Sequence, residues 1–108
     1  MENILEVDDP RGFHVILTSE NWEKHVLLHH PEMKNRLEQV AKTIQKPFPC
    51  ICQDRWEDNC IVYYSKPDRL YIRIVVQIMP KGYGMVNTAY RCRSPKSGES
   101  ILWMAPNN

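Results

Sequence analysis

The sequence has no hydrophobic run long enough to cross a membrane. Its charge-free stretches, such as the apolar one between Arg73 and Lys81, are short, whereas a spanning helix needs about 20 apolar residues. The first nine residues, MENILEVDD, are acidic and lack the basic-then-apolar order of a secretory signal peptide. There is also no internal repeat and no low-complexity tract. These absences predict a protein that stays in the cytoplasm and makes no membrane contact.

Close cysteine pairs are also scarce. Cys50 and Cys52 form the one close pair, while Cys60 and Cys92 stand apart, and structural zinc sites typically use pairs of the CxxC type. Disulfides are disfavoured in the reducing cytoplasm. We therefore expect four buried free thiols that pack as small hydrophobic groups, with a structural zinc site as the alternative.

The familiar catalytic fingerprints are missing as well. There is no P-loop, no dinucleotide-binding glycine pattern, no serine nucleophile elbow and no kinase motif. What the chain does have is 43% hydrophobic and 25% charged residues, which are ordinary values for a globular protein. At 108 residues there is room for one core. We predict a single domain over residues 1–108, with a core at about 13–104 and loose ends at 1–11 and 105–108.

The charge is distributed unevenly along the chain. Residues 1–65 carry a net charge of −4 and residues 66–108 a net charge of +5. A basic C-terminal half permits an anionic partner, nucleic acid included. A solvated basic surface without a partner is the alternative.

The apolar periodicity changes along the chain. A short strand at Phe13–Leu17 precedes a predicted helix from Ser19 to about His29, and a second helix follows between Pro31 and Lys46. From Cys50 onward the period is two, which predicts strands. The predicted fold class is α+β, with two N-terminal helices packed on a four- to five-stranded, mainly antiparallel sheet. The expected strands cover residues 50–53, 60–65, 70–79, 85–92 and 101–104.

The strand at 70–79 has two different faces. Its even positions are all apolar and should face the helices, while its odd positions include Tyr71 and Arg73 and should face an open side. On the neighbouring strand, either Thr88 and Tyr90 or Asn87 and Arg91 share the face of Arg73. A guanidinium beside hydroxyl or amide groups can hold a phosphate. An ordinary cross-strand polar pair is the alternative.

Histidine and tyrosine supply further candidates. His25, His29 and His30 lie within six residues, where they can bind a metal, cap a helix C-terminus or act as acid and base. No third metal ligand of the HExxH kind is near. The five tyrosines all lie in the strand-rich half among arginines, and bases can stack on such rings. Ordinary packing of strand tyrosines is the alternative.

The order of several short motifs resembles a known family. Trp22-Glu23-Lys24-His25-Val26, then His30-Pro31-Glu32-Met33, and finally Asn87-Thr88-Ala89-Tyr90-Arg91 are similar to the phage-type members of the barnase–EndoU–colicin–RelE-like (BECR-fold) superfamily. The resemblance covers roughly residues 15–92. It implies two helices followed by a four-stranded antiparallel sheet. It also implies a metal-independent ribonuclease without a cofactor, in which the 2′-hydroxyl of RNA attacks the adjacent phosphate.

The resemblance also implies roles for individual residues. His25 or His30 would be the acid or base, Arg73 would bind the phosphate and Thr88 would contact it. Tyr90 would stack a base or assist Thr88, and we expect Tyr71, Asn87 and Arg91 to contribute to substrate binding. His25 and His30 lie about 140° apart on a continuous helix, so they converge only if the chain breaks at Pro31.

The expected partners follow from this assignment. RNA would be the substrate, and an immunity or antitoxin protein would be the partner of a phage or mobile-element toxin or accessory nuclease. One alternative is a non-catalytic RNA- or protein-binding module on the same fold. A metal-binding regulator that uses the histidines is a third.

Overall fold

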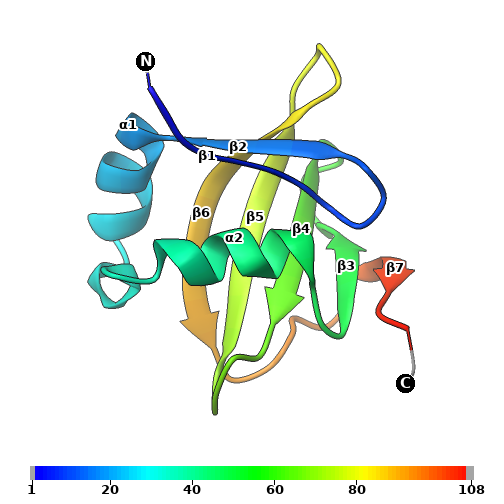
Figure 1. The fold of residues 1–108 in the computed structure, drawn as a ribbon. Coiled ribbons are helices and arrows are strands. Elements are labelled where there is room, and N and C mark those ends of the chain that lie inside the picture. Colours follow the sequence, from blue (N-terminus) through cyan, green and yellow to red (C-terminus); the bar gives the residue numbers. More distant parts are fainter. Residues whose placement is uncertain (1, 107–108) are drawn as a thin grey trace.

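The computed structural model describes residues 2–106, which build one seven-stranded mixed sheet in the order β1-β2-β6-β5-β4-β3-β7 (Figure 1). Neighbouring strands are antiparallel except for β2 and β6, which are parallel. Among the described residues, no helix combines the length and the apolar character that a membrane crossing requires. The strands are β1 (Asn3–Asp8), β2 (His14–Thr18), β3 (Cys50–Gln53), β4 (Cys60–Ser65), β5 (Tyr71–Ile78), β6 (Gly84–Cys92) and β7 (Ser100–Met104).

The predicted fold, two N-terminal helices on a four- to five-stranded sheet, is wrong in both of its parts. The sheet has seven strands because residues 3–8, which we expected to be a loose end, pair with β2 as an N-terminal hairpin. The helical content is also small. It consists of α1 (Ser19–Asn21), the π-helical segment η1 (Trp22–Leu27), the 3-10 turn η2 (Pro31–Met33) and α2 (Leu37–Gln45).

Local chemistry explains where the helical segments begin and end. The Thr18 hydroxyl accepts a hydrogen bond from the Asn21 N–H (3.1 Å) and so caps α1. The expected second helix does not run on from Pro31, because Asn35 adopts a left-handed conformation with φ 68°, which asparagine tolerates better than most residues. As a result, α2 begins only at Leu37, and its apolar stripe with Val40 and Ile44 packs into the same core as Val26 of η1.

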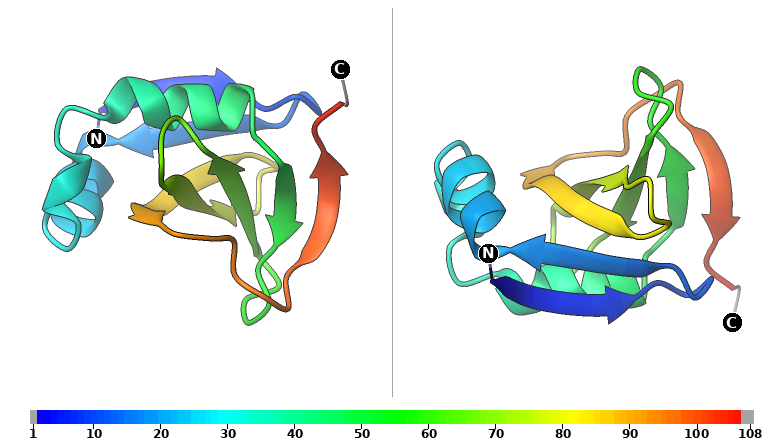
Figure 2. Two further views of the ribbon diagram at one scale, coloured as in Figure 1. Left: turned by 90° about the horizontal axis from the view of Figure 1, so that it is seen from below. Right: turned by 90° about the horizontal axis from the view of Figure 1, so that it is seen from above.

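The main core lies between α2, the N-terminal hairpin and the first face of the sheet. Ile72, Ile74 and Val76 of β5 belong to this core, as the alternation predicted. The second face carries Tyr64, Tyr71 and Arg73. We expected that face to be open, but residues 93–99 pass across it on the side opposite α2 before β7 pairs with β3 (Figure 2). The C-terminal segment therefore covers part of the second face.

Asp9 ties the N-terminal hairpin to the sheet. Its buried carboxylate accepts hydrogen bonds from the Tyr63 hydroxyl (2.7 Å), from Arg11 Nη2 (2.8 Å), and from the backbone N–H groups of Arg11 (2.7 Å) and Phe13 (3.1 Å). Burial by itself would raise the pKa of Asp9. The hydrogen bonds from Tyr63, Arg11 and Phe13 outweigh it and hold that pKa below its usual value of 3.8.

We predict that this carboxylate makes stability fall in acid. The unfolded chain takes up the Asp9 proton at a higher pH than the folded chain, so the stabilisation is complete above about pH 4 and disappears as the pH falls through the lowered folded pKa. Urea denaturation between pH 2 and 7 should show a smaller acid-induced loss for Asp9→Asn than for wild type. Asp58→Asn, at an exposed site, is the control. Equal acid dependence of Asp9→Asn and wild type would contradict the assignment.

Candidate functional site

Arg73 lies at the centre of the second face and is only 4% exposed. The strand register places Tyr64 of β4 and Tyr90 of β6 directly beside it. Its Nε donates to the Tyr64 hydroxyl (3.2 Å) and its Nη1 to the Tyr90 hydroxyl (3.1 Å). Its Nη2 donates to Glu99 Oε2 (2.7 Å) and to Asp54 Oδ1 (3.4 Å). The guanidinium is therefore fixed by two hydroxyls and two carboxylates.

The two carboxylates are buried with the arginine. The side chain of Glu99 is 1% exposed and that of Asp54 is 12% exposed. Burial would raise the pKa of Asp54, but the backbone N–H groups of Glu57 and Trp56, together with Arg73, lower it overall. Burial raises the pKa of Tyr64, and the hydrogen bond that its hydroxyl donates to Glu99 raises it further. The cluster thus combines one cation with carboxylates from two separate loops.

Asp54 and Glu99 are not among the site residues that the sequence motifs predict. A cation within an apolar strand needs a buried anion nearby, because an unpaired buried charge is strongly disfavoured. Only two acidic residues, Asp68 and Glu99, occur after position 65. Because so few acidic residues lie in this part of the chain, Glu99 could have been identified as a candidate partner of Arg73.

His30 joins this cluster through Tyr90. The two rings are stacked, with centroids 5.0 Å apart and an interplanar angle of 24°, and the Arg73 Cζ atom lies 5.7 Å from the Tyr90 ring centroid. His30 reaches this position because it leaves helical geometry (φ −135°, ψ 70°) where Pro31 begins η2. The side chain is 31% exposed. His30, Tyr90 and Arg73 therefore form a continuous row that ends at the surface.

The register also settles which partners share the face of Arg73. Tyr90 pairs with Arg73 and Thr88 pairs with Val75, so Thr88 and Tyr90 lie on that face. Thr88 and Asn87 line a cleft of about 370 Å³ that Asp54 and Glu57 border on the other side. Arg91 instead pairs with Ile72 of the main core and forms an ion pair with Asp68. It does not belong to the Arg73 cluster.

The remaining predicted residues occupy different places. His25 is exposed on η1, so the histidine that meets Tyr90 is His30. Tyr71 shares the face of Arg73 and packs edge-on against Tyr64, with centroids 6.4 Å apart. Within residues 2–106, no group of three or more His, Cys, Asp or Glu side chains is arranged to hold a metal ion.

The thiols are free, and burial raises the pKa of three of them, Cys52, Cys60 and Cys92. Cys50, Cys52 and Cys60 are buried and Cys92 is half-buried, in line with the expectation of thiols packed among apolar groups. The Sγ atoms of Cys50 and Cys52 lie 3.3 Å apart. Burial, together with the neighbouring Cys50, raises the pKa of Cys52 to about 12, which keeps its nucleophilic thiolate form scarce.

Basic side chains gather at one end of the sheet. β4 ends at Ser65, and β5 begins at Tyr71 opposite Cys92, the last residue of β6. The loops 66–70 and 93–99 therefore leave the sheet at the same end, the lower one in Figure 1. We call their exposed cations the basic rim: Lys66, Arg69, Arg93 and Lys96.

Comparison with protein-family models, curated proteins and solved structures gave no match. The similarity of the motifs to the BECR-fold nucleases stays a prediction. The site itself offers an imidazole, a phenol, a guanidinium and a threonine hydroxyl along one face, beside a basic rim. Such groups transfer protons and donate hydrogen bonds to phosphate oxygens.

Proposed function

We propose that the protein is a metal-independent endoribonuclease that acts in the cytoplasm. The 2′-hydroxyl of RNA would attack the adjacent phosphate and release a 2′,3′-cyclic end. The observation that carries this proposal is the row of His30, Tyr90 and Arg73, with Thr88 on the same sheet face. These residues come from distant stretches of the chain and meet at one surface.

Each group has a chemical part in this reaction. The partly exposed imidazole of His30 exchanges a proton with the 2′-hydroxyl or with the leaving 5′-oxygen. The Tyr90 hydroxyl accepts a hydrogen bond from Arg73, which leaves its own proton free to donate to a phosphate oxygen. Thr88 offers a second hydroxyl. Hydrogen bonds and positive charge around the phosphate stabilise the additional negative charge of the transition state.

Arg73 acts mainly as a positioning residue in this proposal. Its hydrogen bonds to Tyr64, Tyr90, Asp54 and Glu99 leave one N–H of Nη1 without a partner among the described residues. That N–H lies next to the Tyr90 hydroxyl. The basic rim would hold neighbouring phosphates of the strand, because exposed cations attract the RNA backbone.

A second candidate function is a non-catalytic RNA-binding module on the same face. The observation that favours it is the pairing of Arg73 with two carboxylates, which already balance its charge. Incubating the purified protein with labelled RNA in EDTA separates the two functions. Fragments with 2′,3′-cyclic phosphate ends support the nuclease. Binding without cleavage, weakened by salt, would assign the second function instead.

The biological setting is part of the same proposal. The motif resemblance favours a toxin or accessory nuclease of a phage or mobile element. An immunity or antitoxin protein that covers the face of His30 and Tyr90 would then be its protein partner.

A further inference from the structure

The cleft of about 370 Å³ on the second face owes part of its lining to a β-bulge in β6. Val75 of β5 pairs with Thr88 and its neighbour Val76 pairs with Val86, so Asn87 is an extra residue without a partner on β5. The residues on either side of Asn87 and Thr88 both belong to the main core. A regular strand would turn one of these two side chains toward the core. The bulge instead brings an amide and a hydroxyl side by side into the cleft.

Several polar groups of this cleft are free to bond a ligand. The side chains of Glu57, Gln77, Asn87 and Thr88 make no hydrogen bond or ion pair with another described residue. Gln77, Asn87 and Thr88 are half-buried. Half-buried polar groups usually have a partner, and here that partner has to come from outside the chain. The two amides and the hydroxyl can both donate and accept.

The loop 54–59 gives the cleft an acidic wall, and hydrogen bonds hold the loop in place. Asp54 Oδ2 accepts from the backbone N–H groups of Trp56 (3.0 Å) and Glu57 (2.9 Å). Burial raises the pKa of the Cys60 thiol, which lines the cleft, and the charges of Asp54 and Glu57 raise that pKa further. No Lys or Arg of the described residues lines the cleft. Its wall therefore favours a ligand that donates hydrogen bonds.

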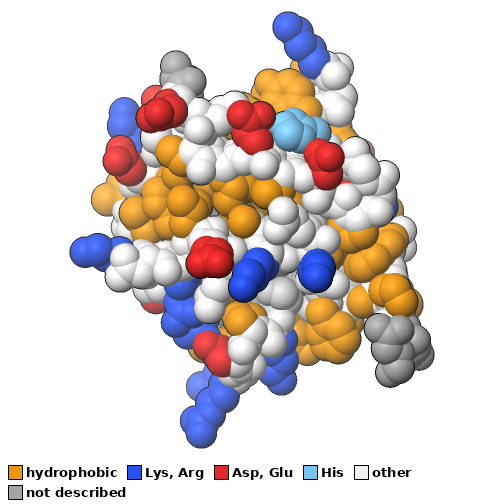
Figure 3. Space-filling model, viewed as in Figure 1, with side chains coloured by type: hydrophobic (Ala, Val, Ile, Leu, Met, Phe, Trp, Pro, Cys, Tyr) orange, Lys and Arg blue, Asp and Glu red, His pale blue; other side chains and the backbone are white. Residues whose placement is uncertain are grey.

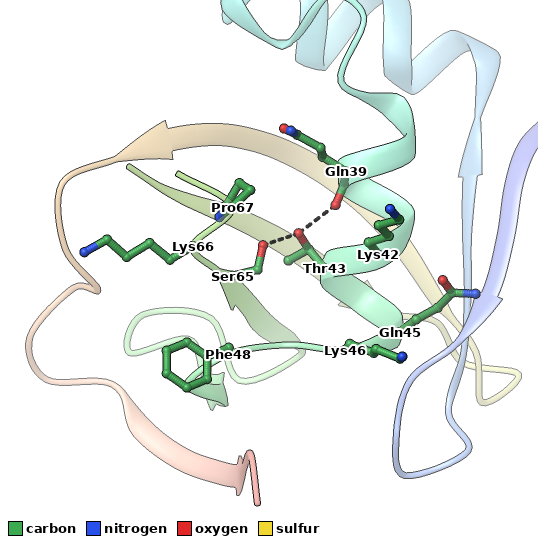
Figure 4. A pocket seen from close by; sticks show the side chains of 9 residues that line it. All are labelled: Gln39, Lys42, Thr43, Gln45, Lys46, Phe48, Ser65, Lys66 and Pro67. Atoms are coloured by element: carbon green, nitrogen blue, oxygen red, sulfur yellow. Dashed lines mark hydrogen bonds between the residues drawn. The ribbon is translucent and has the colours of Figure 1, made fainter. Parts of the chain in front are cut away.

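The groove between α2 and the end of β4, about 600 Å³ in volume, lacks such a converging set of groups. Figure 3 shows Lys and Arg side chains over and below α2, whereas most Asp and Glu side chains of this face lie above, over β1 and β2. Lys42 and Lys46 line the groove at the end of α2, but Lys66 extends away from them (Figure 4). The Lys66 Nζ atom lies 5.2 Å from the ring centroid of Tyr71 on the second face. The cleft is therefore the better candidate for a ligand.

The cleft lies next to the proposed reaction site. Thr88 and Tyr90 share one face of β6 and are two residues apart, a separation of roughly 7 Å along the strand. Asp54, at the border of the cleft, also bonds Arg73 (3.4 Å). A base whose phosphate lies at the Tyr90 hydroxyl can reach the cleft.

We propose that this cleft binds the base of the nucleotide that carries the attacking 2′-hydroxyl, and that it prefers bases with an exocyclic amino group over uracil. The amino group of cytosine, adenine or guanine offers two N–H donors, which fit the Glu57 carboxylate and the side-chain oxygen of Asn87. Uracil has two carbonyl oxygens and a single N–H, so its oxygens would face the acidic wall. The amide N–H groups of Asn87 and Gln77 fit an acceptor beside the amino group. The assignment of this base to an RNA substrate rests on the proposed function.

Titrations of the full chain with 3′-CMP and 3′-UMP, followed by amide chemical shifts, test the cleft without requiring cleavage. We expect 3′-CMP to shift the amides that line the cleft and to bind about tenfold or more tightly than 3′-UMP, because the carboxylate bonds the amino group. Asn87→Ala and Glu57→Gln should each lower this ratio about threefold or more. Gln45→Ala and Asp58→Asn, at exposed positions outside the cleft, are the matched controls and should keep the ratio.

Cleavage of two RNA strands that differ only in one cytosine or uracil gives a second readout. The kcat/KM at cytosine should exceed that at uracil by a similar ratio. Absent or equal binding of the two nucleotides, or a preference that Asn87→Ala and Glu57→Gln leave unchanged, would overturn the cleft. An Asn87-dependent preference for 3′-CMP in a protein that cleaves no RNA would keep the cleft and refute the nuclease. RNA cleavage at equal rates after both bases, with equal binding of both nucleotides, would keep the nuclease and refute the cleft.

Discussion

Replacing Arg73 with methionine should lower the free energy of unfolding by about 3–5 kcal/mol. The substitution leaves Glu99, whose side chain is 1% exposed, without its cation, and removes the donors that hold the hydroxyls of Tyr64 and Tyr90. An uncompensated buried carboxylate is the main source of the cost. Urea denaturation at pH 7, followed by circular dichroism, measures it.

A second variant makes this result specific to the ion pair. Arg73→Met combined with Glu99→Leu removes the two most buried charges and leaves Asp54 with its backbone N–H donors, Trp56 and Glu57. It should recover much of the lost stability, because a buried ion pair is often no more stabilising than apolar residues of similar size. Arg69→Met, at an exposed position of the basic rim, should change stability little. A single Arg73→Met variant as stable as Arg69→Met would contradict the cluster described above.

Replacing His30 with alanine should slow RNA cleavage by about 100-fold or more, the usual contribution of one acid or base group. The loss should appear in kcat, because the imidazole acts on the reacting oxygens more than on binding. His30→Phe is the sharper variant, since it keeps an aromatic ring for the stack on Tyr90 but has no proton to transfer. Cleavage of short RNA in EDTA by each variant gives the rates.

The neighbouring histidines provide the controls. His25 and His29 are both exposed, and neither ring forms the stack that His30 makes with Tyr90. His25→Ala and His29→Ala should therefore keep most of the wild-type rate. An active His30→Phe variant beside an inactive His25→Ala variant would move the proton transfer to His25 and contradict the assignment of His30.

The alternation of apolar residues predicted the central strands well. It depends only on which side chains of one strand are buried, so the neighbouring strand need not be known. Ile72, Ile74 and Val76 of β5 face the core as expected, whereas Ile78 at the end of the strand is exposed. The alternation could not identify β1, whose six residues include two carboxylates and whose partner strand is set by the turn at Asp9. The parallel pairing of β2 with β6 joins stretches almost 70 residues apart. No local pattern encodes such a contact.

The candidate site was predictable to the extent that it depends on strand register and on one proline. The alternation of an antiparallel neighbour placed either Thr88 and Tyr90 or Asn87 and Arg91 on the face of Arg73. Pro31 predicted the break that brings His30 out of helical geometry. Asp54 and Glu99 were not predictable in the same way, because each lies in a loop whose path depends on the whole sheet. For the same reason, the sequence did not predict that residues 93–99 cover part of the second face.

The most direct test compares two RNA strands of identical sequence, one unmodified and one carrying 2′-O-methyl groups, incubated with the wild-type protein in EDTA. If the face of His30, Tyr90 and Arg73 promotes attack by the 2′-hydroxyl, the unmodified strand is cut and the methylated strand, which has no such proton to lose, stays intact. Equal cleavage of both strands, or cleavage of neither, would contradict the account.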